Sequence, residues 1–336
     1  MSTSASFTKP LVSILLPTKN AGEIFEHVLR GIEQQHQVDF EVIICDSGSK
    51  DGTLERIAKF AERVPFKVQL IQIPAAEYGH GKTRNLMAGQ ARGEIIVLLT
   101  HDASPTNAHW LVAITKPFAN PKVGLVFGPQ RPRPDANPVM RADLLNFFAG
   151  FAVAGRTTLY ATNPAPGVDR VGPVSDGLMR FSSDANAAVR RSAWQKCPFR
   201  DVAYCEDQLM ARDLLESGWY KVYEPRASVY HSHNFGIIES FKRYNDEWLG
   251  LKRAFGHVEV RHVWQLPLRI ARASQQNQRA LLADPRLSLW QKIFWSPRVV
   301  ALAKARQLGG YLGPRMERLP HWLQKRISRE AHLIKA

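Results

Sequence analysis

Short apolar runs alternate with segments of helical spacing over the first 130 residues, and this alternation limits the possible fold more than any other feature. The helical segments lie at residues 23–35, 53–63 and 81–91. The apolar runs have the length and the turn boundaries of buried strands, and they lie at residues 12–16, 40–45, 67–73, 94–99 and 123–127. Strands that alternate with helices form a doubly wound, mainly parallel sheet. We therefore predict an α/β fold.

The rest of the chain is less regular. Residues 128–180 are rich in Pro and Gly, which favours loops around a single helix. Beyond His233 the pattern is helical and basic, with no clear strand. In this half of the chain the spacing of apolar residues predicts helices at 140–154, 187–194 and 206–217 and a strand at 220–223.

Basic residues exceed acidic ones by 15, and most of this excess lies near the C-terminus. Residues 237–336 hold 19 Lys and Arg against 7 Asp and Glu, a net charge of +12. A basic surface attracts nucleic acid, anionic lipid head groups or anionic substrates, although a solvated helical face has the same composition. Trp290, Phe294 and Trp295 are interleaved with these charges, which is typical of a helix at a membrane surface and equally of a helical cap.

No segment indicates export or membrane insertion. The N-terminal stretch lacks a basic start followed by an apolar run, and no apolar segment is long enough to cross a bilayer. The spacing of Cys45, Cys197 and Cys205 supports neither disulfides nor a zinc cluster. We therefore expect a cytoplasmic protein with reduced thiols.

One carboxylate stands directly after the apolar strand at 94–99, in the run Thr100-His101-Asp102. Ligands of open α/β sheets collect outside the carboxyl ends of the strands, where a carboxylate can hold a divalent cation against a nucleotide diphosphate. An Asp at this place also serves as a turn residue or a helix cap. The chemistry of Asp102 therefore depends on the motifs around it.

Three motifs together resemble the nucleotide-binding half of family 2 glycosyltransferases with the GT-A fold. They are Ser13-Ile14-Leu15-Leu16-Pro17-Thr18-Lys19-Asn20, Ile43-Ile44-Cys45-Asp46-Ser47-Gly48-Ser49-Lys50-Asp51-Gly52-Thr53, and the run from Gly93 to Asp102. The resemblance extends through Cys205-Glu206-Asp207-Gln208 to His231-Ser232-His233. The runs Gly79-His80-Gly81-Lys82-Thr83-Arg84-Asn85 and Thr100-His101-Asp102-Ala103-Ser104-Pro105 are similar to those of the bacterial rhamnosyltransferase branch.

This resemblance implies a GT-A catalytic domain at residues 10–236 and a basic helical extension at 237–336. The donor-binding half would span about 10–128 and the acceptor half about 129–236. On the donor side, the resemblance assigns the pyrimidine base and the phosphates to Pro17, Thr18, Asp46, Lys82, Arg84, His101 and Asp102. The alternative for Asp46 is a cap of the following loop, and the alternative for Arg84 is an exposed charge on a helix.

The resemblance also implies a divalent cation, Mg²⁺ or Mn²⁺. Family members have Asp-x-Asp where this chain has Thr100-His101-Asp102, so the first carboxylate is missing. His231 or His233 would complete the coordination, because a histidine after the last strand often faces the metal in GT-A enzymes. We expect one of the two histidines to be the ligand and the other to be structural.

On the acceptor side, Asp207 occupies the place of the family's catalytic base, with Glu206 as a positioning residue. Both also fit as ordinary acidic residues in the first turn of a helix. Asp184, Asn186 and Trp194 are candidates for contact with the sugar or the acceptor, although Asp184 and Asn186 are also typical helix caps and Trp194 a typical core residue. A single carboxylate on the acceptor side predicts direct displacement with inversion at the anomeric carbon.

The combined expectation is an inverting, metal-dependent glycosyltransferase. It would move L-rhamnose from dTDP-rhamnose onto a saccharide or lipid-linked saccharide of a bacterial surface polysaccharide, with peripheral contact to an anionic membrane. A UDP-hexose or UDP-N-acetylhexosamine donor is the alternative within the class. A nicotinamide enzyme is disfavoured because no G-x-G-x-x-G follows the first strand, and a nucleic-acid-binding protein because no known module signature accompanies the charge.

Overall fold

The computed structural model describes residues 12–330. The domain start predicted at residue 10 and the last six residues of the predicted extension lie outside the described residues. The chain divides into two compact units. The first comprises residues up to 131 together with 147–202 and 206–231, and the second comprises 132–146, 203–205 and the chain from 232 onward.

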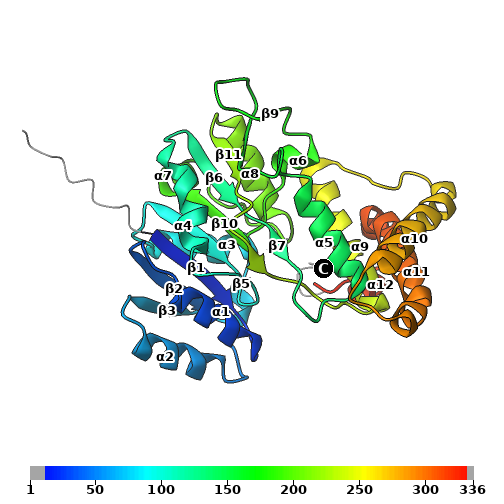
Figure 1. Ribbon diagram of the computed structural model, residues 1–336, viewed down its shortest axis with the longest axis horizontal. Coiled ribbons are helices and arrows are strands. Elements are labelled where there is room, and N and C mark those ends of the chain that lie inside the picture. Colours follow the sequence, from blue (N-terminus) through cyan, green and yellow to red (C-terminus); the bar gives the residue numbers. More distant parts are fainter. Residues whose placement is uncertain (1–11, 331–336) are drawn as a thin grey trace, which may run out of the picture. The chain divides into compact units, whose positions relative to one another are not determined.

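A nine-stranded sheet forms the centre of the first unit (Figure 1). Its strand order is β3-β2-β1-β4-β10-β6-β11-β8-β9. Pairing is parallel from β3 to β4, between β6 and β11 and between β8 and β9, whereas β10 runs antiparallel to β4 and β6, and β8 runs antiparallel to β11. The strands are β1 (Val12–Thr18), β2 (Phe40–Asp46), β3 (Val68–Gln72), β4 (Ile95–Leu99), β6 (Val123–Phe127), β8 (Thr158–Ala161), β9 (Arg170–Val171), β10 (Asn186–Arg190) and β11 (Tyr220–Tyr223). The predicted α/β fold with a mostly parallel sheet is confirmed.

A second, three-stranded sheet of two-residue strands lies in the same unit. Its order is β5-β12-β7, with β5 (Ser104–Pro105), β12 (Val229–Tyr230) and β7 (Gln130–Arg131). Strands this short have no side-chain periodicity, and the sequence did not predict them. They bring three segments distant in sequence to one place.

The helices of the first unit cover the large sheet with apolar faces. In α1, for example, Phe25, Val28, Leu29 and Ile32 recur at helical spacing and are fully buried. The helical elements of this unit are α1 (Ile24–Glu33), α2 (Thr53–Arg63), η1 (Ala75–Glu77), α3 (His80–Gln90), α4 (Trp110–Thr115), η2 (Lys116–Ala119), α6 (Gly177–Arg180), α7 (Arg191–Lys196) and α8 (Glu206–Glu216).

Strand β10 corrects the helix predicted at 187–194. Residues Asn186–Arg190 form a strand between β4 and β6, and only the part from Arg191 onward is helical, as α7. Ala187, Ala188 and Val189 are completely buried, because β4 and β6 flank this strand and both faces of the sheet are covered here. A strand buried on all sides loses the alternation that distinguishes it from a buried helix, so periodicity was misleading here.

The second unit is helical, as predicted for the C-terminal region. Helix α11 packs against α9 and α10, and η4 against α9. At Gly309 a Cβ atom would lie 2.6 Å from the Phe241 carbonyl oxygen, so glycine permits the close approach of α11 to α9. None of the helices within 12–330 has the length and apolar character needed to cross a membrane. The elements are α9 (Ile237–Phe255), η3 (Val263–Gln265), α10 (Leu266–Ala283), α11 (Leu289–Leu312), η4 (Gly313–Arg318) and α12 (His321–Ile327), and α5 (Pro138–Ala149) begins in this unit.

Candidate active site

The carboxyl ends of β1 and β2 carry two of the predicted donor-binding residues side by side. Thr18 and Asp46 are register partners, and the Thr18 hydroxyl donates to Asp46 Oδ2 over 3.2 Å. Asp46 Oδ1 accepts from the backbone N–H groups of Gly48 and Ser49, each at 2.9 Å. The predicted capping role of Asp46 is therefore present, since its carboxylate organises the loop before α2. Pro17 is buried beside Thr18, and contact with a nucleotide base stays a prediction.

Asp102 lies against His231, and the small sheet explains why. Strand β12 pairs with β5 on one side and β7 on the other, which places His231 Nε2 at 3.4 Å from Asp102 Oδ1. The other ring nitrogen, Nδ1, lies 2.8 Å from the Gln130 side-chain oxygen, an acceptor only, so Nδ1 donates, and in the neutral imidazole the lone pair is then on Nε2. Asp102 Oδ1 also accepts from the Thr100 hydroxyl at 2.7 Å. Gln130 orients the imidazole, a role that no local pattern of residues indicates.

His233 lies two residues further along the same segment and projects to the same side as His231, as residues two apart on an extended segment do. The expectation that one of the two histidines is structural is therefore corrected, and both stay candidate ligands. Asp102, His231 and His233 each offer one ligand atom, and these atoms lie within 4.8 Å of one another. One carboxylate oxygen and two imidazole nitrogens suit a transition metal such as Mn²⁺ better than Mg²⁺, which prefers an all-oxygen shell. The residues present therefore fit a divalent cation. His101, between Thr100 and Asp102, is half-buried.

Arg84 on α3 is buried against two of the carboxylates predicted on the acceptor side. Its Nη1 donates to Glu206 Oε1 at 2.9 Å and to the His80 carbonyl at 3.0 Å. Its Nε lies 2.9 Å from Asp184 Oδ2, close enough for an ion pair but without the alignment of a hydrogen bond. The side chains of Arg84, Asp184 and Glu206 are only 6%, 5% and 9% exposed. With Asp207, these residues form what we call the buried charge cluster.

The buried charge cluster perturbs the titration of its own members. Burial raises the pKa of Asp184 to about 7, against the lowering effect of Arg84. Removal from solvent also raises the pKa of Asp207 well above its ordinary value, and the charges of Glu206 and Asp184 add to this shift. Two carboxyl groups of the cluster therefore hold a proton more firmly than an exposed aspartate does.

Backbone geometry fixes where the members of this cluster lie. The chain enters α8 through Cys205 in a left-handed conformation with φ of +66°, which is strained for a residue other than glycine. Asp207, in the first turn of α8, is half-buried, and its Oδ1 accepts from the N–H of Gln208 at 2.7 Å. In α3, a Cβ at Gly81 would lie 2.1 Å from the Arg200 carbonyl oxygen, so this motif glycine permits the close packing of α3.

The remaining predicted residues lie apart from this cluster or are engaged with the protein. Asn186 is completely buried: its Nδ2 donates to the carbonyls of Pro129 and Ala227, and its Oδ1 accepts from Trp110 Nε1. Trp194 is half-buried and donates from Nε1 to Asn85 Oδ1 at 2.9 Å. Lys82 is exposed on α3. Their roles toward donor or acceptor stay predictions, as does the donor contact predicted for Arg84.

The fold resembles that of solved glycosyltransferases. A mannosyltransferase from Pyrobaculum calidifontis, in complex with GDP-Man and Mn²⁺, superposes with a TM-score of 0.53 at 20% identity, covering 93% of this chain and 75% of its own. TarS residues 1–349 from S. aureus superposes with a TM-score of 0.50 at 14% identity, covering 91% of both chains. These structures share the GT-A fold with this protein.

The sequence comparisons agree with the fold. The O-antigen chain rhamnosyltransferase RfbN of Salmonella typhimurium is 28% identical over 92% of this chain and 91% of its own length. WbaN of Salmonella anatum, another O-antigen chain rhamnosyltransferase, is 27% identical over 93% and 91%. The family model described as Glycosyl transferase family 2 matches residues 13–197, more than half of the chain. The chain therefore belongs to glycosyl transferase family 2, and the protein is a glycosyltransferase.

Proposed function

We propose that the enzyme transfers L-rhamnose from dTDP-rhamnose to a saccharide or lipid-linked saccharide acceptor of a bacterial surface polysaccharide. The observation that carries this proposal is the extent of the similarity to O-antigen chain rhamnosyltransferases, which covers more than nine-tenths of both chains. Because less than a tenth of the chain is left out, the similarity also includes most of the C-terminal helices. We further propose that the enzyme works at the inner face of the cell membrane.

Asp207 is the proposed base that takes the proton of the acceptor hydroxyl. It lies in the N-terminal turn of α8 and is half-buried, so the residue is not closed off from an acceptor. Its raised pKa increases its proton affinity toward that needed for general base catalysis near neutral pH. Glu206 is committed to Arg84 and is proposed as a positioning residue. Attack by the activated hydroxyl without an enzyme-bound intermediate inverts the anomeric carbon.

The donor is proposed to bind at the carboxyl ends of β1, β2 and β4. Thr18 and Asp46 would meet the pyrimidine base, and Asp102, His231 and His233 would hold Mn²⁺ or Mg²⁺ beside the diphosphate. The bound cation would neutralise charge on the leaving nucleotide diphosphate. The Gln130 contact supports this arrangement, because it leaves His231 Nε2 as an electron-pair donor beside Asp102.

Calorimetry with dTDP-rhamnose, UDP-glucose, UDP-N-acetylglucosamine and GDP-mannose tests the donor, each with Mn²⁺ and again with a chelator. We expect selective, metal-dependent binding of dTDP-rhamnose, and Asp102→Ala should weaken it. Asp207→Asn should retain donor binding and lose transfer by at least about a hundredfold, since general base catalysis contributes that much or more. Glu216→Gln, at the other end of α8, is the matched control and should keep full transfer.

Two outcomes would contradict this proposal. Preference for a UDP-sugar would remove the rhamnosyl assignment while leaving the GT-A enzyme. Full transfer by Asp207→Asn would remove this residue from the role of base.

A further inference from the structure

The antiparallel pair of α10 and α11 ends in an exposed apolar surface that the proposed chemistry does not use. We call residues 279–298, which include the turn between these two helices, the hairpin tip. Five large apolar side chains of the tip are more than half exposed: Leu282 at 60%, Leu289 at 70%, Trp290 at 79%, Ile293 at 53% and Phe294 at 55%. Isolated exposed apolar residues are ordinary, but a group of this size at the adjoining ends of two helices indicates an interaction surface.

Helix α11 has a second apolar face, and this second face forms the core of the unit. Val299 and Leu302 are buried against Leu281 and Val139. At about 100° per residue, they lie on the side of the helix opposite to Leu289, Trp290, Ile293 and Phe294. The packing of Val299 and Leu302 thus does not use the exposed face. The exposed stripe is an additional apolar surface of the folded unit.

The charge around this stripe is almost entirely positive. Residues 266–312 contain eight Lys and Arg against one acidic residue, Asp284. Asp284 is buried, accepts from Arg141 Nη1 at 2.7 Å, and is also paired with Arg286. Arg279 and Arg298 are exposed beside the stripe, and Lys292 is half-exposed between its apolar residues. The surface of the tip therefore combines Trp, Phe, Leu and Ile with excess positive charge.

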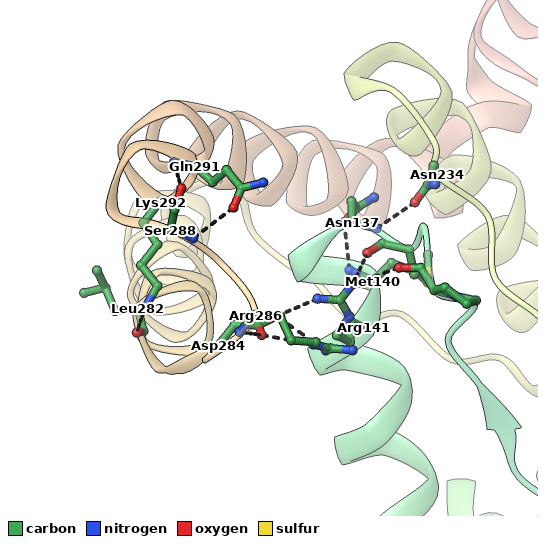
Figure 2. A network of polar contacts seen from close by, with 12 residues as sticks. Asn137, Met140, Arg141, Asn234, Leu282, Asp284, Arg286, Ser288, Gln291 and Lys292 are labelled. Atoms are coloured by element: carbon green, nitrogen blue, oxygen red, sulfur yellow. Dashed lines mark hydrogen bonds and ion pairs between the residues drawn. The ribbon is translucent and has the colours of Figure 1, made fainter.

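Polar contacts hold the turn of the tip in one conformation (Figure 2). Ser288 and Gln291 form a reciprocal capping box at the start of α11, with donor–acceptor distances of 2.9 and 3.3 Å. Lys292 Nζ donates to the Leu282 carbonyl at 2.7 Å, which ties α11 to the end of α10. Because the turn is already ordered, docking through its apolar side chains requires little loss of backbone entropy.

We infer that the hairpin tip docks the enzyme onto the interface of an anionic bilayer. Trp and Phe favour the boundary between head groups and acyl chains, while Arg and Lys on the same surface attract anionic head groups. A second copy of the chain fits less well, since a two-fold contact at the tip would bring like charges together. The inference rests on the proposed function only for the presence of a lipid-linked acceptor, and the docking is tested without donor or acceptor.

Flotation of the full chain with phosphatidylcholine vesicles, with and without phosphatidylglycerol, tests the inference. We expect binding to the anionic vesicles that decreases as salt is added. The double variant Trp290→Ser with Phe294→Ser should lower the partition coefficient by about tenfold or more, because two aromatic side chains no longer enter the interface. The matched control is Trp264→Ser, which removes a tryptophan of similar exposure, 72%, from η3, just before the far end of α10 and about 27 Å away along that 18-residue helix.

A second variant separates charge from apolar contact. Arg279→Gln should reduce binding to anionic vesicles while leaving the weaker binding to neutral vesicles unchanged. The inference is overturned if the wild-type chain does not float, or if the Trp264 control loses as much binding as the tip variant. It is also overturned if sedimentation velocity shows a wild-type dimer that the tip variant converts to monomer. Donor binding by calorimetry stays unchanged in all variants, so failure here is distinct from failure of the proposed function.

Discussion

Replacing Arg84 by Met removes the cation of the buried charge cluster while keeping an unbranched side chain of similar length. Asp184 and Glu206 then remain buried beside each other without the guanidinium that contacts both. Removing one partner of a buried ion pair generally costs about 3–5 kcal/mol, because the remaining charge stays unsolvated. We expect Arg84→Met to lower the free energy of unfolding by about this amount near pH 8.

The size of this loss should depend on pH, since protonation relieves the unpaired carboxylates. The pKa of Asp184 in the folded protein is already raised, to about 7, and the loss of Arg84 raises it further. A carboxyl group with a raised pKa stabilises the fold fully below its unfolded value and loses this contribution as the pH rises through the folded value. The gap between wild type and variant should therefore be small near pH 5 and largest near pH 8.

Urea unfolding followed by circular dichroism at both pH values measures this gap. Adding Asp184→Asn and Glu206→Gln to Arg84→Met should recover most of the loss, because neutral amides do not require a buried counter-ion. Arg63→Met is the control: it breaks a solvent-exposed pair with Glu33 and should cost less than about 1 kcal/mol. A loss below about 1 kcal/mol for Arg84→Met, or an equal loss at both pH values, would refute the argument.

Two further predictions concern the same unit. In a plot of transfer rate against pH, the rate should fall on the acid side at a pH above the ordinary aspartate range, because the base Asp207 has a raised pKa. Asp184→Asn removes a neighbouring negative charge and should move this fall in rate to lower pH. A fall at unchanged pH would contradict the electrostatic coupling of the two carboxyl groups. Lys221 is 1% exposed, and its Nζ donates to the carbonyls of Leu178, Met179 and Phe181. Lys221→Met should cost at least about 2 kcal/mol in thermal unfolding, because these carbonyls lose their donor, and a neutral effect would show that water replaces it.

The sequence predicted the parts of the fold that depend on local pattern. The strands β1, β2, β4 and β6 have apolar runs bounded by turn residues, and α1 has an apolar stripe, so each was visible without a structure. Strand β10 was not, because residues 187–189 are as apolar as a buried helix would be. Its identity as a strand follows from pairing with β4 and β6, which no local window contains.

The same distinction between local pattern and distant pairing applies to the residues of the candidate site. Asp102 follows a predicted strand and Asp207 stands at the start of a predicted helix. Their places, at the carboxyl end of the sheet's strands and in a first helical turn, could therefore be predicted. The pairing of Arg84 with Asp184 spans 100 residues, and that of Gln130 with His231 spans 101, so local spacing gave no sign of either. The raised pKa of Asp184 likewise follows from burial beside other charges, which is a property of the folded chain.

The position of β10 within the sheet also matters while the chain is being synthesised. Strand β4 is entirely apolar and ends at Leu99, but its partner β10 ends only at Arg190, 91 residues later. At about 5–20 residues per second, the backbone groups on this edge of β4 wait roughly 5–20 s for their partner after β4 emerges from the ribosome. An apolar edge of this kind readily pairs with other chains. Nascent or truncated chains that stop before residue 190 are therefore exposed to aggregation, and synthesis of β10 is the step that closes the middle of the sheet.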